Sequence, residues 1–230
     1  MNLHQSGIFI VMKYPEIGNV KSRLGKSIGA EAATNLYHAF IQDTIKAVES
    51  IECSFYIAVH PPSSLEQFTQ LVGSSYNLFP QKGMNLGERL QNGFLTMFDA
   101  GYKQAIALAS DSPDLPSHIL EEALSSLQTH DAVLGPTPDG GYYLIGFSYE
   151  RFVPEVFIDV PWGSESVFEE TIARIRPSIE QLYLLPEWDD IDTKDDLRKF
   201  YERYKSESVN SLDSMKFLRS HPELIEILYS

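Results

Sequence analysis

The segment from residue 12 to residue 29 concentrates positive charge in a chain that has 18 basic and 32 acidic residues. It carries Lys13, Lys21, Arg23 and Lys26. Lys21 and Arg23 lie two residues apart, so in an extended loop their side chains face the same way. A lysine point charge beside a forked guanidinium suits a polyphosphate. We predict a substrate-binding loop in which Lys21 and Arg23 take part in catalysis and Lys13 helps to bind; a solvated surface loop is the alternative.

An acidic motif, SDSPDLP, follows an apolar run that ends at Ala109. Asp111 comes just after the run, and Asp114 lies three residues further on. Carboxylates at the end of a strand are suitable ligands for Mg²⁺ or Mn²⁺, which usually also hold substrate phosphates. We predict that Asp111 is a metal ligand and a catalytic residue, and that Asp114 caps the turn or supports the site. The alternative for Asp111 is a local backbone cap.

A second acidic cluster consists of Asp189, Asp190 and Asp192. Three like charges this close repel one another unless a cation or a cationic side chain lies among them. Asp190 and Asp192 would face the same side of an extended segment, and Asp192 could hold one metal ion together with Asp111. The alternative is a solvated acidic loop before a helix that Thr193 caps.

The turn GPTPDGG is rich in glycine and proline. Asp139 precedes Gly140 and Gly141, where the missing Cβ would let the backbone pass close to a substrate. Asp-Gly is also a common hairpin turn. The spacing alone leaves a substrate-binding turn and an ordinary turn equally open.

The elements that must position these residues alternate between strand and helix in the first half of the chain. Short apolar runs predict strands, and helical spacing of apolar residues predicts helices. The strands are expected at 7–13, 54–59, 76–79 and 104–109, and the helices at 30–50, 63–71, 86–97 and 117–128. This alternation predicts an α/β fold, a three-layer sandwich with a mostly parallel central sheet and helices on both faces.

The second half of the chain breaks this rhythm. Two closely spaced strands, at 131–134 and 142–147, predict a small antiparallel insertion. A helix at 164–175, a strand at 182–185, a helix at 194–204 and a helical tail from about 209 follow. Ligands of open parallel sheets bind at the carboxyl ends of the strands. The four motifs described at the start of this subsection are all expected at such strand ends.

Bulk composition limits the classes of protein. A net charge of -14 argues against non-specific binding to nucleic acid, because phosphates repel an acidic surface. The N-terminal residues show no charged-then-apolar leader, and the apolar runs are too short to cross a membrane. We expect a cytoplasmic protein with one domain over residues 1–230. The tail would dock on this domain or on a second subunit, which leaves a homodimer open.

Five segments together resemble the nucleotide-diphospho-sugar transferase superfamily, whose fold is the glycosyltransferase A-type (GT-A) fold. They are KYPEIGNVKSRLG, NLGERL, SDSPDLP, PDGGYYLIG and DDIDTKDDL. The chain is most similar to the radical-SAM-associated, arsenosugar-type glycosyltransferase family, and more distantly to guanylyltransferases for phospholactate and molybdenum cofactor. The motifs span most of residues 7–200 and are specific for the superfamily, but not for a substrate.

The resemblance implies a role for each matching residue. Lys21 and Arg23 would contact phosphates, and Asn85 and Arg89 would lie near the nucleotide. Asp111 would bind the metal, with Asp192 and also Asp190 as partner ligands. Gly140 and Gly141 would approach the donor or the acceptor. The chain departs from the pattern in its glycine-poor first loop and in Asp111-Ser112-Pro113-Asp114, which stands where glycosyltransferases have Asp-x-Asp.

Three functions remain open from the sequence. The first is a metal-dependent glycosyltransferase that uses a nucleotide-sugar and a small-molecule acceptor, with Mg²⁺ or Mn²⁺ as cofactor. The second is a nucleotidyltransferase that joins a nucleoside triphosphate to a phosphorylated acceptor and releases pyrophosphate. The third is a non-catalytic nucleotide-binding domain.

Overall fold

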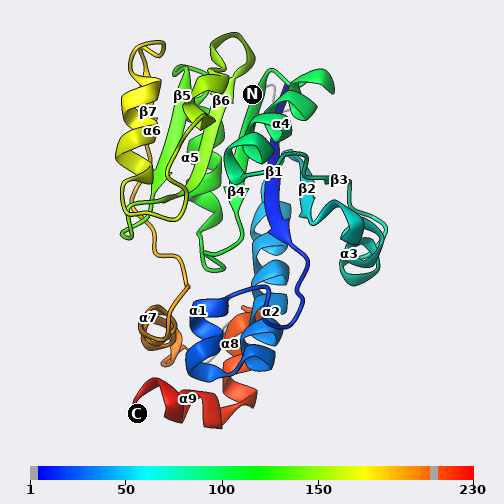
Figure 1. The fold of residues 1–230 in the computed structure, drawn as a ribbon, viewed down its shortest axis with the longest axis vertical. Helices are drawn as coiled ribbons and strands as arrows, with labels where there is room; N and C mark the ends of the chain where they lie inside the picture. The colour runs from blue at the N-terminus through cyan, green and yellow to red at the C-terminus, as the bar shows by residue number, and fades with distance from the viewer. Residues whose placement is uncertain (1–4, 208–211) are drawn as a thin grey trace.

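A mixed β-sheet organises the computed structural model, which describes residues 5–207 and 212–230. Within these residues seven strands form one sheet in the order β3-β2-β1-β4-β6-β5-β7 (Figure 1). The strands are β1 Ser6–Lys13, β2 Ser54–His60, β3 Leu78–Pro80, β4 Gln104–Ala109, β5 Ala132–Pro136, β6 Tyr142–Ser148 and β7 Leu182–Leu184.

Strand direction confirms the predicted antiparallel insertion. β1 pairs in parallel with β2 and β4, β2 with β3, and β5 with β7. β6 runs antiparallel to both of its neighbours, β4 and β5. The chain leaves β1 toward β2 and β3 and then returns to the other side of β1 with β4. The order of the strands therefore reverses between β1 and β4.

Helices cover both faces of the sheet, because successive strand residues point to opposite sides. On β1, Ile8 and Ile10 pack into one apolar cluster with the helices α2 (Ala30–Glu49) and α5 (Ser117–Ser126). Phe9 packs into a second cluster with α4 (Leu86–Asp99) and α6 (Val167–Ile175). This confirms the predicted α/β architecture. The helices are α1 Ser22–Ile28, α2 Ala30–Glu49, α3 Leu65–Val72, α4 Leu86–Asp99, α5 Ser117–Ser126, α6 Val167–Ile175, α7 Lys194–Tyr204, α8 Asp213–Ser220 and α9 Pro222–Leu228.

A group of helices that we call the basal helices lies beyond one end of the sheet; it consists of α1, α7, α8 and α9 and the end of α2 that extends past the sheet (Figure 1). α8 packs along α2, and α9 packs against α1, α7 and α8. The predicted helical tail therefore folds back on its own chain. Its predicted start near 209 lies outside the described residues. None of the helices in the described ranges is long and apolar enough to cross a membrane.

A buried carboxylate joins α8 to α2. The Asp213 and Ser214 amides at the start of α8 donate hydrogen bonds to the two carboxylate oxygens of Asp43 on α2, at 2.6 and 2.9 Å. Only 2% of Asp43 is exposed. Asp43 therefore caps a helix that is distant in sequence and supplies acceptors for amides that the helix itself leaves unpaired.

Replacing Asp43 by alanine is expected to lower the free energy of unfolding by about 2 kcal/mol, because two amides at a helix start lose their acceptor. Chemical denaturation would measure this loss. Asp213→Ala is the control. It removes surface ion pairs with Lys46 and Lys216 and should cost less than about 1 kcal/mol. Equal effects of the two variants would contradict a capping role for Asp43.

One prediction about local structure was wrong and another is confirmed. The segment around Lys21 is not an extended loop, because α1 begins at Ser22. Lys21 is the N-cap of this helix and has the left-handed backbone angles φ 47° and ψ 42°. The predicted Thr193 cap is present, and Thr193 and Asp196 form a complete capping box at the start of α7.

Candidate active site

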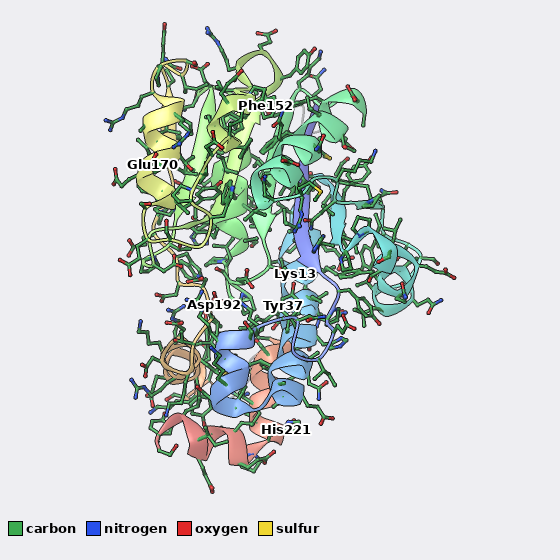
Figure 2. The ribbon with its side chains drawn as sticks, in the orientation of Figure 1. Lys13, Tyr37, Phe152, Glu170, Asp192 and His221 are labelled. Carbon is green, nitrogen blue, oxygen red and sulfur yellow. The ribbon has the colours of Figure 1, made fainter. Side chains whose placement is uncertain are left out.

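A pocket of about 990 Å³ opens at the carboxyl ends of β1 and β4. These are the strands between which the strand order reverses, and open α/β sheets bind their ligands at such a point. Figure 2 shows Lys13, Tyr37 and Asp192 where the carboxyl end of β1 meets the basal helices. The pocket is lined by the β1–α1 segment, the β4–α5 loop, the β5–β6 turn and the β7–α7 loop.

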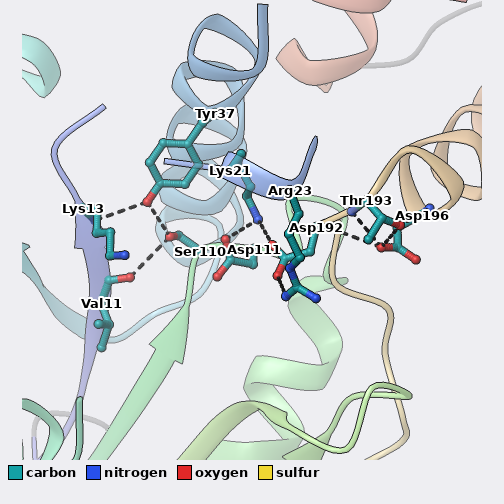
Figure 3. Close-up of polar contacts among 10 residues, drawn as sticks. All are labelled: Val11, Lys13, Lys21, Arg23, Tyr37, Ser110, Asp111, Asp192, Thr193 and Asp196. Carbon is teal, nitrogen blue, oxygen red and sulfur yellow. Dashed lines mark hydrogen bonds and ion pairs between the residues drawn. The ribbon is translucent and has the colours of Figure 1, made fainter. Parts of the chain in front are cut away.

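Two cations and two carboxylates from distant parts of the chain meet in this pocket (Figure 3). Lys21 Nζ forms an ion pair with Asp111 and a second one with Asp192 Oδ1, at 2.9 Å. Arg23 donates from its guanidinium to Asp192 Oδ2 at 2.5 Å. The structure thus brings together the predicted residues of the first loop, the SDSPDLP motif and the second acidic cluster.

Lys21 is held firmly at the centre of this group. Its side chain is only 3% exposed, and its ammonium group lies 5.5 Å from the centre of the Phe40 ring. Burial alone would lower the pKa of Lys21, but the carboxylates of Asp111 and Asp192 outweigh burial and raise it above its ordinary value. A left-handed backbone is unfavourable for a residue with a side chain, and such strain is found most often at functional sites.

The same two cations set the charge of Asp192. Burial would raise the pKa of its carboxyl group, but Lys21 and Arg23 hold this pKa below its ordinary value. Asp192 is therefore ionised at neutral pH and available as an anionic ligand. Asp111 has a side chain that is 44% exposed, so it reaches the open part of the pocket.

Asp190 lies in the same pocket, but its surroundings disfavour the ionised form of its carboxyl group. Its burial, together with the charges of Asp139, Asp192 and Asp111, raises the pKa of its carboxyl group from the ordinary value of 3.8 to about 7. A cation close to these carboxylates would relieve their mutual repulsion.

Asp190→Asn is expected to stabilise the protein in a pH-dependent way. A raised pKa means that the folded state binds the proton more tightly than the unfolded state, so stability falls as pH rises from about 4 to about 7. At pH 8 the variant should gain about 1–2 kcal/mol, a figure reduced for screening by solvent because Asp190 is only half-buried. Denaturation at pH 8 and pH 4 would test this; an equal gain at both values would contradict it.

Tyr37 and Ser110 form a network that the sequence analysis missed. The Tyr37 hydroxyl accepts a hydrogen bond from the Lys13 amide at 3.2 Å and lies 3.0 Å from Ser110 Oγ. Ser110 Oγ lies 3.3 Å from the carbonyl oxygen of Val11. Burial, and then the charge of Asp111, raise the pKa of Tyr37 to about 12. The network ties the ends of β1 and β4 to α2. The one signal of this network in the sequence is the hydroxyl group of Tyr37, which stands within an otherwise apolar stripe of the predicted helix.

The β5–β6 turn is both an ordinary turn and a wall of the pocket. Asp139 Oδ1 accepts hydrogen bonds from Thr137 Oγ1 at 2.6 Å and from the Gly141 amide at 3.0 Å. Gly140 has φ 85°, and a Cβ there would lie 2.0 Å from the carbonyl oxygen of Glu165. The turn therefore packs directly against the segment before α6, and Asp139, Gly140 and Gly141 all line the pocket.

The NLGERL motif contributes to the pocket through Arg89 rather than Asn85. Asn85 Oδ1 accepts a hydrogen bond from the Glu88 amide at 2.9 Å and caps α4. Arg89 and Leu86 line the pocket, and Arg89 Nε donates to the Gly83 carbonyl oxygen at 3.2 Å. Lys13 also lines it.

Asp114 of the SDSPDLP motif and Asp189 of the second acidic cluster stabilise the fold. Asp114 accepts hydrogen bonds from Arg203 at 2.5 Å, the Tyr204 hydroxyl at 3.1 Å and Trp188 Nε1 at 3.2 Å. Arg203 also pairs with Asp189. This network joins the β4–α5 loop to α7, in agreement with the supporting role predicted for Asp114.

The carboxylates of the pocket fit a divalent cation only together with a ligand from the substrate. Across residues 5–207 and 212–230 no three His, Cys, Asp or Glu side chains converge closely enough to hold a metal on their own. Asp111 and Asp192 supply two carboxylates on opposite sides of one ammonium group. Because Mg²⁺ usually binds one or two carboxylates together with substrate phosphates, these residues fit a cation that binds with a polyphosphate.

Comparison with solved structures gives a close relative. A protein provisionally named a nucleotide-diphospho-sugar transferase, from Desulfovibrio desulfuricans G20, is 35% identical, with 97% of each chain covered and a TM-score of 0.92. A CMP:2-keto-3-deoxy-manno-octonic acid synthetase in complex with CTP is 13% identical, with 88% of this chain and 99% of that chain covered and a TM-score of 0.57. A cytidylyltransferase from Leptospira borgpetersenii serovar Hardjo-bovis (strain JB197) is 14% identical, with coverages of 96% and 97% and a TM-score of 0.52. These last two show the shared fold.

Sequence comparison places the chain in a family of uncharacterised bacterial proteins. No protein with a curated description matches the chain. The model of the family described as "Uncharacterized protein conserved in bacteria (DUF2064)" matches residues 44–164, which is more than half of the chain. The chain therefore belongs to the DUF2064 family, and it has the GT-A-like fold of the nucleotide-diphospho-sugar transferase superfamily that its motifs resemble.

Proposed function

We propose that this protein is a transferase that acts on a nucleotide-activated substrate, and that its reaction is glycosyl transfer from a nucleotide-diphospho-sugar. The observation that carries the proposal is the convergence of Lys21, Arg23, Asp111 and Asp192 in one pocket at the point where the strand order reverses. The fold shared with the relative from Desulfovibrio desulfuricans supports a nucleotide-using transferase.

The residues of the pocket divide the work of such a reaction. Asp111 and Asp192, with Asp190 beside them, would hold Mg²⁺ or Mn²⁺, which when bound would neutralise the diphosphate of the donor. Lys21 and Arg23 would share the charge that develops on this leaving group, as positioned cations stabilise a transition state. The bond between the sugar and the diphosphate would break with its electron pair on the diphosphate, and the acceptor hydroxyl oxygen would form the new bond to the sugar and release its proton to solvent.

The other side of the pocket suits a sugar. Asp139 and Glu165 line the pocket together with the aromatic residues Tyr142 and Trp162, of which Tyr142 has a buried hydroxyl. Carboxylates accept hydrogen bonds from hydroxyl groups, and aromatic side chains present an apolar body together with a polar tip. The absent Cβ of Gly140 lets the turn pack against the Glu165 carbonyl oxygen, so Gly140 and Gly141 shape this wall of the pocket for the donor or the acceptor. These features favour a glycosyl donor and a small-molecule acceptor.

Nucleotidyl transfer is the second candidate. Four cationic side chains line the pocket, from Lys13, Lys21, Arg23 and Arg89, and this charge suits a nucleoside triphosphate. A phosphorylated acceptor would then attack the α-phosphate, and pyrophosphate would leave. Under either proposal the net charge of -14 makes nucleic acid an unsuitable partner and is compatible with the expected cytoplasmic location.

A thermal-shift screen of nucleotide-sugars and nucleoside triphosphates, each with and without Mg²⁺ or Mn²⁺, tests the proposal. A ligand that binds only the folded state raises the melting temperature by mass action. Metal-dependent stabilisation by a nucleotide-sugar, followed by release of its nucleoside diphosphate in the presence of an acceptor, is the expected result. Stabilisation by a nucleoside triphosphate but by no nucleotide-sugar, together with release of pyrophosphate, would move the assignment to nucleotidyl transfer. No shift with any of these ligands would count against both.

A further inference from the structure

One ammonium group occupies the space between the two carboxylates that are best placed to bind a metal. Lys21 Nζ contacts both Asp111 and Asp192, on loops that follow β4 and β7. A divalent cation that bridged these carboxylates would need the same position. Lys21 and such a cation would therefore exclude one another.

Each of the two carboxylates is also already paired with a cation of the chain. Lys21 and Arg23 supply two positive charges, and Asp111 and Asp192 supply two negative ones. A carboxylate that is already paired with a buried cation attracts a divalent cation far less than a free carboxylate does, because the nearest positive charge opposes that attraction most strongly. A metal ion alone would have to break buried ion pairs before it could bind.

The position of Lys21 is fixed by its surroundings. Its side chain is 3% exposed, and its ammonium group lies 6.0 and 5.5 Å from the centres of the Tyr37 and Phe40 rings. Lys21 is also the N-cap of α1, a helix that packs against α2, α7 and α9. The ammonium group is therefore a built part of the pocket rather than a surface charge that fluctuates in solvent.

A polyphosphate would change this balance. It brings several negative charges into the pocket, where Lys13 and Arg89 offer additional positive charge. Its oxygens can accept hydrogen bonds from the Lys21 ammonium group, which frees the two carboxylates, and they can also supply the missing ligands of the metal. The polyphosphate thus takes the Lys21 ammonium group from the carboxylates, and the divalent cation neutralises the carboxylates that would otherwise repel the polyphosphate.

We infer that Lys21 closes the Asp111–Asp192 pair to divalent cations until a polyphosphate draws its ammonium group away, so that metal and polyphosphate bind together and neither binds well alone. This inference rests on the proposed metal-dependent function, but it concerns the order of binding rather than the chemistry. It assigns Lys21 a positioning role that precedes its contact with the leaving group.

The affinity of the full chain for Mn²⁺ in the absence of any nucleotide tests the inference. Electron paramagnetic resonance measures this affinity, because free Mn²⁺ and bound Mn²⁺ give different signals. Lys21→Met keeps most of the length of the side chain and removes the charge, so it should bind Mn²⁺ at least about tenfold more tightly than the wild type. Arg23→Met is the matched control, because it also removes one positive charge from Asp192 but leaves Lys21 in place. Its affinity for Mn²⁺ should change less than about threefold.

The wild type gives a second test that does not depend on the folding of a variant. Mn²⁺ or inorganic pyrophosphate alone should leave its melting temperature nearly unchanged, whereas the two together should raise it, since coupling between two ligands is reciprocal. Water-proton relaxation would distinguish Mn²⁺ bound to the protein from Mn²⁺ bound to free pyrophosphate.

Three outcomes would overturn the inference. The wild type would bind Mn²⁺ alone as tightly as Lys21→Met, or Arg23→Met would gain as much affinity as Lys21→Met, or no form of the protein would bind Mn²⁺ even with pyrophosphate. The last outcome would also remove the metal from the proposed function. Joint binding of Mn²⁺ and pyrophosphate without turnover of any nucleotide-sugar or triphosphate would support the inference and count against the proposed function.

Discussion

Asp111→Asn is expected to lower the rate of transfer by about a thousandfold or more, because the asparagine keeps the shape of the side chain but loses the charge that a metal ligand needs. The fold should remain intact. The Asp111 side chain is 44% exposed, and the backbone carbonyl that accepts a hydrogen bond from the Ile191 amide at 2.9 Å is unchanged. Lys21 would keep Asp192 as an ionic partner. Steady-state kinetics with the donor found in the screen would measure the loss.

Asp189→Asn is the matched control for Asp111→Asn. It makes the same change of charge within the second acidic cluster, but Asp189 pairs with Arg203 and does not line the pocket. We expect this variant to retain most of its activity. Full turnover by Asp111→Asn, or equal losses in the two variants, would show that the carboxylate of Asp111 does not take part in the reaction.

Gly140→Ala should be the most damaging substitution in the β5–β6 turn. The added Cβ would lie 2.0 Å from the carbonyl oxygen of Glu165, and the backbone at φ 85° is unfavourable for alanine. The turn would have to move away from the segment before α6, and the hydrogen bond from the Phe168 amide to the Gly140 carbonyl would be strained. We expect a loss of about 3 kcal/mol in the free energy of unfolding and a displaced wall of the pocket.

Gly163→Ala separates the clash from the backbone effect. Gly163 has φ 84°, almost the same as Gly140, but a Cβ at this position meets nothing within 4 Å. This variant should therefore lose only about 1 kcal/mol, the ordinary penalty of a left-handed alanine. Denaturation curves of both variants measure the difference, and a loss as large in Gly163→Ala would show that strain, rather than the contact with Glu165, makes Gly140 necessary.

The sequence predicted the layers of the fold because these depend on local patterns. Apolar runs such as residues 104–109 became buried strands, and the spacing of apolar residues in 30–50 became α2. The Thr193 cap was also predictable, since all of its hydrogen bonds lie within four residues. Periodicity and capping are properties of short segments, so one sequence is enough to find them.

The geometry of the site depends on contacts that no short segment contains. Lys21 reaches Asp192 across 171 positions of the chain, and Asp114 meets Arg203 across 89. The sequence predicted that Asp111 and Asp192 would share a cation, but it could not show that a lysine of this chain would lie between them. Tyr37 was missed for a related reason, because an aromatic residue in an apolar stripe of a helix is usually part of the core.

The packing of α9 against α1 has a consequence for the synthesis of this protein. Lys21 caps α1, and α1 packs against α2, α7 and residues 222–228 of α9. During translation the sheet and its helices can emerge from the ribosome and collapse well before those residues do. The pocket would then be assembled in its final form only after α9 has emerged, so that a nascent chain has the fold of its sheet before it can bind its substrate.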